Sequence, residues 1–369
     1  MRVPTILIPS DSGSLGDWKY GEGELSLLLA EESCDTAGQW FYFQVLGLPE
    51  IEMLSVSISN ADQSLYPKGW PEYSPVFSVN GQVWKKSSPI HIDTSGRANF
   101  RISEPPPEFF LAWYEPYPLA RMRSFLGELS RRPNFEVRYP LEDFAFVSIG
   151  TPRDGTILII ARQHPGETMG SFLVEGLLEA LSNSEPSAAF DRIQFLIFPM
   201  MNPRGVEMGK HRFSCEGIDF NRSWADINCP PEVRYVKDAL GLSEKTCAFI
   251  DIHGDEVRRN APNYLEPEPS SDAESSLAQK RLVRNITKTT VDLEVLGDSQ
   301  SVFRTIGSKV LKHRAPKGIV GTATHFAKTS YGIPSITYEV RAHNTTSSDC
   351  RQLGKSLARA LIEFVESAE

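Results

Sequence analysis

Four uninterrupted apolar runs of strand length set the strongest limit on how this chain can fold. They are "TILIIAR" at 156–162, "IQFLIFPMM" at 193–201, "CAFIDIHG" at 247–254 and "PSITYEV" at 334–340. Strands that are apolar on both faces are typical of parallel sheets covered by helices on both sides. Helix-like segments separate or follow these runs, at about 168–183, 231–240, 272–290 and 349–366. The sequence therefore predicts an α/β fold with a mixed, mostly parallel central sheet flanked by helices.

A different pattern precedes these runs, from residue 38 to about residue 113. Short aromatic and β-branched segments alternate there with turn signals, as in "QWFYFQVLGLP" and "YSPVFSVNGQVWKK", which is typical of antiparallel strands. Three consecutive prolines at 105–107 interrupt the pattern, because proline cannot donate to a sheet ladder or continue a helix. We therefore expect an N-terminal antiparallel β-sandwich domain at 1–114 and a second domain at 115–369.

Composition narrows the class of protein. The 369 residues carry a net charge of -9, with lysine and arginine scattered along the chain, which argues against nucleic-acid and anionic-membrane partners. No apolar run approaches the roughly 18 residues of a membrane span. The five cysteines are an odd number without CxxC spacing, a pattern that favours reduced thiols over a disulfide framework. We expect a cytoplasmic protein.

Polar residues follow each apolar run, at the strand ends where ligands collect in open α/β sheets. In "ARQHPGETMGSF", residues 161–172, His164 and Glu167 stand three positions apart around a Pro-Gly pair that predicts a tight turn. A catalytic zinc ion takes three protein ligands, with imidazole nitrogen and carboxylate oxygen among the suitable donors, and keeps a fourth position open. His164 and Glu167 supply two such ligands, and His253, at the end of another strand, is the best-placed third candidate.

Further motifs follow the HxxE pair along the chain. "NPRG" stands at 202–205 and "DFNR" at 219–222, with Arg212 between them and a late glutamate, Glu339, in "SITYEV". In this order the motifs resemble those of the zinc metallocarboxypeptidases, over roughly residues 115–366. The first motif and the upstream β pattern are most similar to the cytosolic carboxypeptidases, the deglutamylase-like branch. The resemblance implies a zinc carboxypeptidase-like domain that binds one zinc ion and hydrolyses the C-terminal peptide bond of peptides or proteins.

The resemblance also implies which residues carry the chemistry. His164, Glu167 and His253 match the zinc ligands. Glu339 matches the general base, and Arg212 matches the arginine that polarises the scissile carbonyl. A buried carboxylate beside a zinc-bound water can take its proton and pass it to the departing amine.

Three further residues match positions that bind the substrate or support a ligand. Asn221 and Arg222 match the pair that holds the substrate's terminal carboxylate, which suits the two-point binding of an arginine fork. Asp219 matches the carboxylate that orients a zinc-binding histidine, since a ligating imidazole commonly donates its other N–H to a carboxylate.

Two departures leave alternatives open. Arg204 in "NPRG" stands where the carboxypeptidases usually have aspartate, and this motif is also similar to the aspartoacylases and succinylglutamate desuccinylases, which implies a zinc-dependent N-acyl amino acid amidohydrolase as an alternative. A second alternative is an inactive peptide-binding module. Arg341, in "EVRAHN", could pair with an acidic terminal residue if it faces the pocket, and a preference for C-terminal glutamate is the corresponding expectation.

Overall fold

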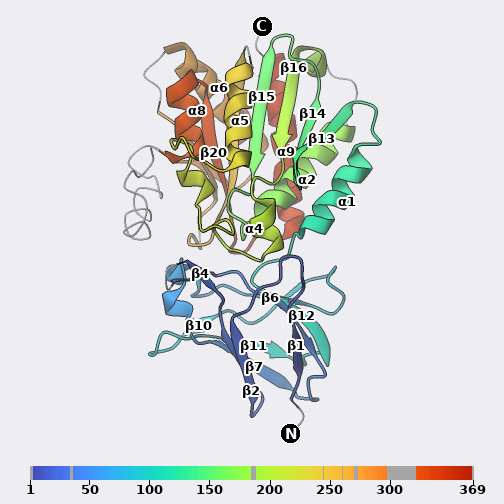
Figure 1. Cartoon of the computed structure of the whole chain (residues 1–369), viewed down its shortest axis with the longest axis vertical. Coiled ribbons are helices and arrows are strands. Elements are labelled where there is room, and N and C mark those ends of the chain that lie inside the picture. The colour runs from blue at the N-terminus through green and yellow to red at the C-terminus, as the bar shows by residue number, and fades with distance from the viewer. Residues whose placement is uncertain are drawn as a thin grey trace.

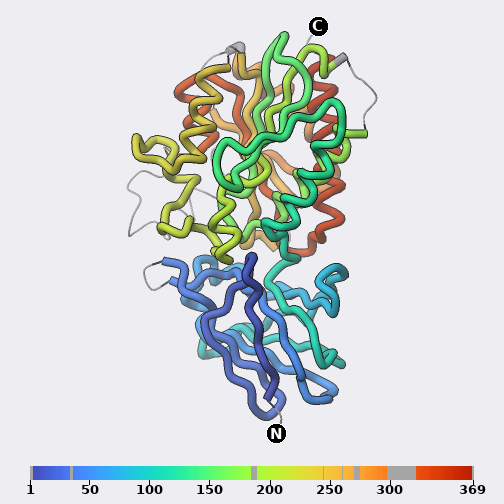
Figure 2. The backbone as a smooth tube through the Cα atoms, turned by 45° about the vertical axis from the view of Figure 1, so that its right-hand side comes forward, coloured from blue at the N-terminus to red at the C-terminus, as the bar shows by residue number. Residues whose placement is uncertain are grey.

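The computed structural model of the chain describes residues 3–33, 36–183, 188–243, 245–259, 261–269, 273–296 and 321–367. An amino-terminal part made of β strands lies against the end of a larger part in which helices surround one sheet (Figures 1 and 2). The predicted α/β fold with a central, largely parallel sheet and an added β domain is confirmed.

Two five-stranded sheets form most of the amino-terminal part. The first has the order β1 (Thr5–Leu7), β6 (Tyr42–Leu46), β12 (Glu108–Ala112), β8 (Val76–Ser78) and β9 (Lys85–Lys86). The second has the order β10 (His91–Ile92), β11 (Ala98–Ser103), β7 (Met53–Ile58), β3 (Glu24–Leu28) and β2 (Asp17–Gly21). The pairing is antiparallel except between β3 and β7. A small hairpin, β4 (Glu31–Ser33) with β5 (Thr36–Ala37), and two short 3₁₀ turns, η1 (Ala61–Gln63) and η2 (Pro67–Gly69), complete this part as the structure describes it.

The alternating pattern of the amino-terminal strands builds a core between these two sheets. Leu54, Val56 and Ile58 of β7 share one buried cluster with Phe109 and Leu111 of β12. Burial of alternate apolar side chains is what an antiparallel strand with one covered face requires.

The large sheet contains eight strands in the described residues. Their order is β13 (Phe135–Leu141), β14 (Phe144–Ile149), β16 (Ile193–Phe198), β15 (Gly155–Ala161), β17 (Thr246–Asp255), β20 (Ser335–Arg341), β18 (Asn263–Pro267) and β19 (Leu293–Val295). The four predicted apolar runs are the adjacent strands β16, β15, β17 and β20, and they pair in parallel. Their carboxyl ends therefore meet at one edge of the sheet.

Side chains of β15 show that the sheet is covered on both faces. Ile157 and Ile159 belong to one buried cluster, whereas Leu158 and Ile160 belong to the other. Successive side chains of a strand point to opposite faces, so each face of the sheet has its own core.

Helices cover these faces. The four predicted helices correspond to α2 (Thr168–Asn183), α5 (Pro231–Leu242), α6 (Ala273–Thr289) and α9 (Ser347–Glu366). The structure adds α1 (Leu119–Leu129), α3 (Ala188–Arg192), α4 (Pro203–Glu207), α8 (Ala323–Tyr331) and the 3₁₀ turn η3 (Phe220–Arg222). A capping box between Thr346 and Asp349 starts α9, and Leu353, Leu357 and Leu361 on one side of this helix are buried. Within the described residues, none of the helices combines the length and apolar character that crossing a membrane requires.

The junction between the two parts lies between β12, which ends at Ala112, and α1, which begins at Leu119. The predicted boundary at 114/115 falls in this connection and stays a prediction. Helix α1 follows Pro118, which gives no side-chain cap. Instead the carboxylate of Asp11, in the amino-terminal part, accepts hydrogen bonds from the backbone N–H groups of Leu119 and Ala120, at 3.0 and 2.8 Å. The two parts are therefore joined by specific contacts as well as by the chain.

Candidate metal centre

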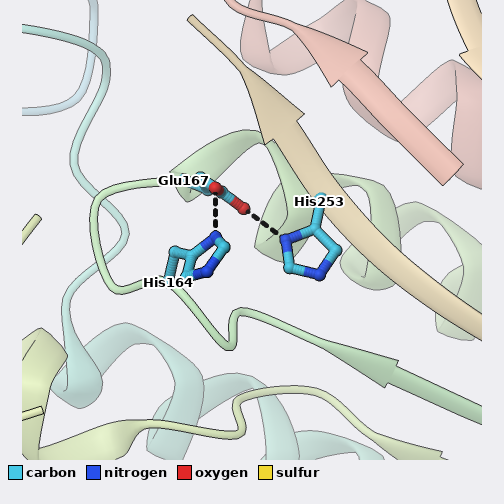
Figure 3. Close-up of side chains that lie close together, drawn as sticks. All are labelled: His164, Glu167 and His253. Atoms are coloured by element: carbon cyan, nitrogen blue, oxygen red, sulfur yellow. Dashed lines mark hydrogen bonds and ion pairs between the residues drawn. The ribbon is translucent and has the colours of Figure 1, made fainter. Parts of the chain in front are cut away.

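His164, Glu167 and His253 come together where strands β15 and β17 end (Figure 3). Nδ1 of His164 lies 2.6 Å from one carboxylate oxygen of Glu167, and Nδ1 of His253 lies 3.0 Å from the other. All three residues are buried, and their ligand atoms lie within 4.8 Å of one another. The structure thus brings the three predicted ligands to one point.

Two residues, Arg162 and Gly166, determine the shape of the turn that places Glu167 beside His164. Arg162, at the end of β15, has a φ of +61°, a left-handed conformation that is unfavourable for a residue with a side chain. Its buried guanidinium donates to the carbonyl of Pro165 and to the hydroxyl of Ser171, both at 2.7 Å. Gly166 has no room for a side chain, because a Cβ there would lie 2.4 Å from Nδ1 of His211. These contacts fix the turn of the HxxE motif.

Each histidine of the group also faces a second carboxylate. Nε2 of His164 lies 3.2 Å from Oδ1 of Asp219. Nε2 of His253 lies 2.9 Å from Oδ2 of Asp251, which is fully buried two residues earlier on β17. A carboxylate on the far nitrogen keeps a proton there and leaves Nδ1 free to bind a metal.

The electrostatics favour an ionised carboxylate among the histidines. Burial alone raises the pKa of Glu167, but His164 and His253 outweigh this effect and leave its pKa below the usual range. Burial lowers the pKa of His253, and the carboxylates of Asp251 and Glu167 reverse the shift and raise the pKa well above its ordinary value. The negative charge of these carboxylates therefore favours the binding of a cation at this site.

This donor set fits zinc. Two imidazole nitrogens and one carboxylate oxygen are the ligands of many catalytic zinc sites, which keep a fourth position for water or substrate. The orienting carboxylates on the far side of both rings complete the arrangement that such sites commonly show.

Glu339, the predicted general base, lies on β20 directly opposite His253 of β17. Its side chain is buried, and Oε2 has no hydrogen-bond partner among the described residues. Burial raises the pKa of Glu339 well above its usual range, and His253 opposes the shift. A cation bound to the neighbouring histidine would act in the same direction as His253, favouring the ionised form.

Arg212 contacts the same group through Asp219. Its Nε and Nη2 lie 2.8 and 2.7 Å from Oδ2 of Asp219, whose other oxygen faces His164. Its Nη1 donates to the hydroxyl of Tyr66, in the amino-terminal part. Burial lowers the pKa of Arg212, but Asp219 outweighs it, so the pKa is raised and the guanidinium stays charged.

Asn221 and Arg222, on η3, lie beside the metal group. The amide nitrogen of Asn221 is 3.0 Å from Nε2 of His253, and its oxygen accepts the backbone N–H of Ala323 at 3.0 Å. Arg222 donates to the backbone carbonyl of Asn221 at 2.7 Å. Burial lowers the pKa of Arg222, and Asp219 opposes the shift.

Arg341 lies at the end of β20, two residues after Glu339. Its Nη1 donates to the carbonyl of Ala261 at 2.5 Å, and its Nη2 donates to Oδ2 of Asp292 at 2.7 Å. The sequence predicts a role for Arg341 in substrate binding, and the structure shows which contacts a substrate would have to compete with.

Sequence reasoning missed several residues that support the site. Asp251 could have been found, because residues two apart on a strand point to the same face, and "DIH" places it beside His253. Gln163 contacts Oδ2 of Asp251 at 2.7 Å and accepts the indole N–H of Trp224 at 2.8 Å. No sequence pattern pointed to Tyr66, because its partner, Arg212, is 146 residues away in the sequence.

Comparison with known families agrees with this site. A family model described as the cytosolic carboxypeptidase N-terminal domain matches residues 9–113. A second family model, described as zinc carboxypeptidase, matches residues 145–355. Together they cover both parts of the structure.

Individual relatives are consistent with these matches. An uncharacterised protein of Zymomonas mobilis is 30% identical over 258 residues, which is 67% of this chain and 66% of that protein. Human cytosolic carboxypeptidase 6 is 28% identical over 292 residues, which is 69% of this chain and 58% of that protein. The matched regions thus span between about half and two thirds of the length of these relatives.

Solved structures with the same fold span the whole chain. A metallo-carboxypeptidase of Burkholderia cenocepacia has a TM-score of 0.83 at 24% identity and covers 100% of both chains. A metallo-carboxypeptidase of Pseudomonas aeruginosa has a TM-score of 0.85 at 21% identity, over 99% of this chain and 100% of that one. At this sequence identity the structural similarity establishes the fold only. The family models establish the family. The chain belongs to the zinc carboxypeptidase family, in the branch that carries the cytosolic carboxypeptidase N-terminal domain.

Proposed function

We propose that the protein is a zinc-dependent metallocarboxypeptidase that hydrolyses the C-terminal peptide bond of peptide or protein substrates. The observation that carries this proposal is the buried group of His164, Glu167 and His253, with Glu339 opposite His253 on the next strand. A bound zinc ion would acidify a water molecule and polarise the scissile carbonyl.

The residues around that group would carry the proton and the developing charge. Glu339 takes a proton from the attacking water and delivers it to the nitrogen of the departing amino acid as the C–N bond breaks. Arg212, whose charge is secured by Asp219, stabilises the negative oxygen that forms on the scissile carbonyl. The products are a shortened peptide with a new carboxylate and one free amino acid.

Recognition of the chain end falls to Asn221 and Arg222. Arg222 is half-buried and lies beside Asn221, next to His253. A guanidinium in such a place gains strong hydrogen bonds from a carboxylate ligand. This arrangement selects a substrate that ends in a free carboxylate.

We further propose a preference for a C-terminal glutamate, with Arg341 as its partner. Arg341 follows Glu339 by two residues on β20, so the two side chains leave the strand on the same face. Its present partner, Asp292, is partly exposed, so an acidic side chain of the substrate could replace it.

The test is metal analysis together with amino acid release from peptides ending in glutamate, leucine or lysine. The wild type should hold one zinc ion per chain and release the terminal residue, fastest for glutamate. Glu339→Gln should keep the metal and lose turnover by about 10²- to 10⁴-fold. Glu363→Gln changes a part-exposed carboxylate of α9 that is paired with Lys288 of α6. It is the matched control and should turn over normally.

Other results would redirect the assignment. Bound zinc with hydrolysis of N-acetyl-aspartate or N-succinyl-glutamate and no release from peptides would make the protein an amidohydrolase. Peptide binding without any hydrolysis would show that the protein is an inactive peptide-binding module. Fastest release of lysine or leucine would reject the proposed glutamate preference alone.

We propose that residues 1–114 and 115–369 are two domains. The last strand of the amino-terminal sheets ends at Ala112, and the first helix of the other part begins at Leu119. Trp113, Tyr114 and Tyr117 of this connection are buried, so the boundary is tested by producing residues 1–114 and 115–369 as separate chains. Each fragment should fold, and failure of both fragments to fold while the full chain does would contradict the boundary.

We also propose a cytoplasmic location. Relatives in the matched branch are named cytosolic carboxypeptidases, and Cys215, Cys229, Cys247 and Cys350 are free thiols. Cell fractionation with activity assays would test this, and recovery of the protein in an extracytoplasmic fraction would contradict it.

A further inference from the structure

Glu32, in the amino-terminal domain, binds the backbone of the segment that carries Arg212. Glu32, on β4, accepts the backbone N–H groups of His211 at 2.9 and 3.0 Å, of Arg212 at 2.7 Å and of Phe213 at 2.9 Å. The Glu32 side chain is buried. Hydrogen bonds from consecutive N–H groups to an ionised acceptor are strong, so Glu32 sets the path of this segment.

A second side chain of the same domain contacts the guanidinium itself. The hydroxyl of Tyr66, just before η2, accepts from Nη1 of Arg212, while Asp219 binds Nε and Nη2. Burial raises the pKa of Tyr66, so the hydroxyl stays neutral. The Tyr66 ring also meets the His211 ring edge-on, with the ring centroids 5.8 Å apart.

These contacts leave Arg212 with a defined set of remaining donors. A guanidinium has five N–H groups. Asp219 and Tyr66 engage three of them, so among the described residues one N–H on each terminal nitrogen remains without a recorded partner. Two donors fixed in a plane are suited to one substrate oxygen, and their direction depends on both partners.

We propose that Glu32 and Tyr66 are positioning residues for Arg212, so that the amino-terminal domain completes the catalytic site. This inference rests on the proposed function, in which Arg212 stabilises the negative oxygen of the scissile carbonyl. Glu32 fixes the backbone of residues 211–213, and Tyr66 fixes the rotation of the guanidinium. Neither side chain needs to touch the substrate.

The test is steady-state kinetics of the zinc-loaded full chain on the peptide, among those ending in glutamate, leucine or lysine, that the wild type cleaves fastest. Tyr66→Phe and Glu32→Gln should each lower kcat by about ten- to a hundredfold, because a small displacement of a catalytic group has this effect. KM and metal content should change less than about twofold, since the ligands stay in place.

Two control variants separate positioning from general loss of packing. Tyr73→Phe removes another buried hydroxyl of the same domain, which donates to the carbonyl of Trp113 at 2.6 Å. Glu175→Gln removes a buried negative charge that binds Arg121 and Arg351. Both controls should keep the wild-type kcat per folded protein, whatever their melting temperatures.

A double-mutant comparison shows whether the effect passes through Arg212. Arg212→Lys should lower kcat by on the order of 10²-fold, as loss of an oxyanion donor does. Adding Tyr66→Phe to Arg212→Lys should then change kcat by less than about twofold. Independent, multiplicative effects of the two substitutions would overturn the inference.

The remaining outcomes distinguish this inference from the proposed function. If Arg212→Lys is impaired while Tyr66→Phe and Glu32→Gln both retain the wild-type kcat, the positioning role fails and the function stands. If Arg212→Lys itself turns over normally, the proposed role of Arg212 fails and the positioning role fails with it.

Discussion

His253 of β17 and Glu339 of β20 are direct neighbours across a parallel strand pair. Neighbouring strands lie about 4.8 Å apart and paired side chains point to the same face. The proposed metal ligand and the proposed general base are thereby held on strands rather than on loops. Sites held in this way keep their geometry more accurately than sites built on loops.

The first prediction concerns Asp251, which lies 2.9 Å from the far nitrogen of His253. Asp251→Asn removes the charge that orients this ring, so we expect metal affinity to fall by about 10- to 100-fold. Zinc competition with a chelator of known affinity measures this change. Asp154→Asn, which alters a part-exposed carboxylate paired with Arg192, should bind zinc as the wild type does. Equal affinities for Asp251→Asn and the wild type would show that His253 needs no such partner.

The second prediction concerns Arg222 and the chain end. Charged hydrogen bonds contribute about 1.5–3 kcal/mol, so Arg222→Gln should raise KM for free-acid peptides by roughly 10- to 100-fold. It should also reduce the discrimination between a peptide acid and the same peptide as a C-terminal amide. Assays of the same peptide as the free acid and as the C-terminal amide measure both the KM and this discrimination. Arg234→Gln is the control, because its guanidinium binds the carbonyl of Ile227 on the surface. Undiminished preference for the free acid in Arg222→Gln would contradict the assignment.

Features that depend on residues close together in the sequence could be predicted, whereas features that depend on contacts between distant residues could not. The apolar runs of β15 and β17, and the HxxE motif, are local patterns, and the structure brings their predicted ligands together. Helix α1 was not predicted: its N-cap residue, Pro118, gives no side-chain cap, and the carboxylate that accepts its first N–H groups belongs to Asp11, 108 residues upstream. Glu32 was missed for the same reason, since its contacts with the Arg212 segment span about 180 residues. Such contacts depend on how two domains pack, and no local pattern encodes them.

The third prediction concerns the crossing of α2 and α9. A Cβ on Gly354 would lie 1.9 Å from the backbone oxygen of Leu173 and 2.6 Å from the backbone nitrogen of Leu177. Since backbone atoms must move to make room, Gly354→Ala should lower the free energy of unfolding by about 1–3 kcal/mol.

A matched variant makes this prediction specific. A Cβ placed on Gly127, in α1, would have no described atom within 4 Å apart from its chain neighbours and the nearby backbone of its own helix. Gly127→Ala should therefore stabilise the protein by about 0.5–1 kcal/mol, through the helix preference for alanine. Denaturant unfolding of both variants measures the two effects. Equal stability changes of the same sign would mean that the α2–α9 contact adapts to a side chain.

The fourth prediction concerns His343, which is buried where the two domains meet. One ring nitrogen donates to the carbonyl of Gly69 at 3.0 Å, and Tyr73 lies edge-on, with the ring centroids 5.1 Å apart. Burial lowers the pKa of His343 below its ordinary 6.5, and the Gly69 carbonyl opposes the shift. Of the charged groups nearby, Arg259 lowers this pKa and Glu72 raises it.

The sign of the pH effect follows from this lowered pKa. Just below pH 6.5 the unfolded chain binds a proton at His343 that the folded chain binds only at lower pH, so stability rises with pH in this window. The stabilising contribution is present in full above pH 6.5 and is lost as the pH falls through the folded pKa. The melting temperature of His343→Gln should therefore fall less than that of the wild type between pH 7.5 and 5.5. Parallel curves for the two proteins would show that His343 does not control the acid sensitivity of the domain contact.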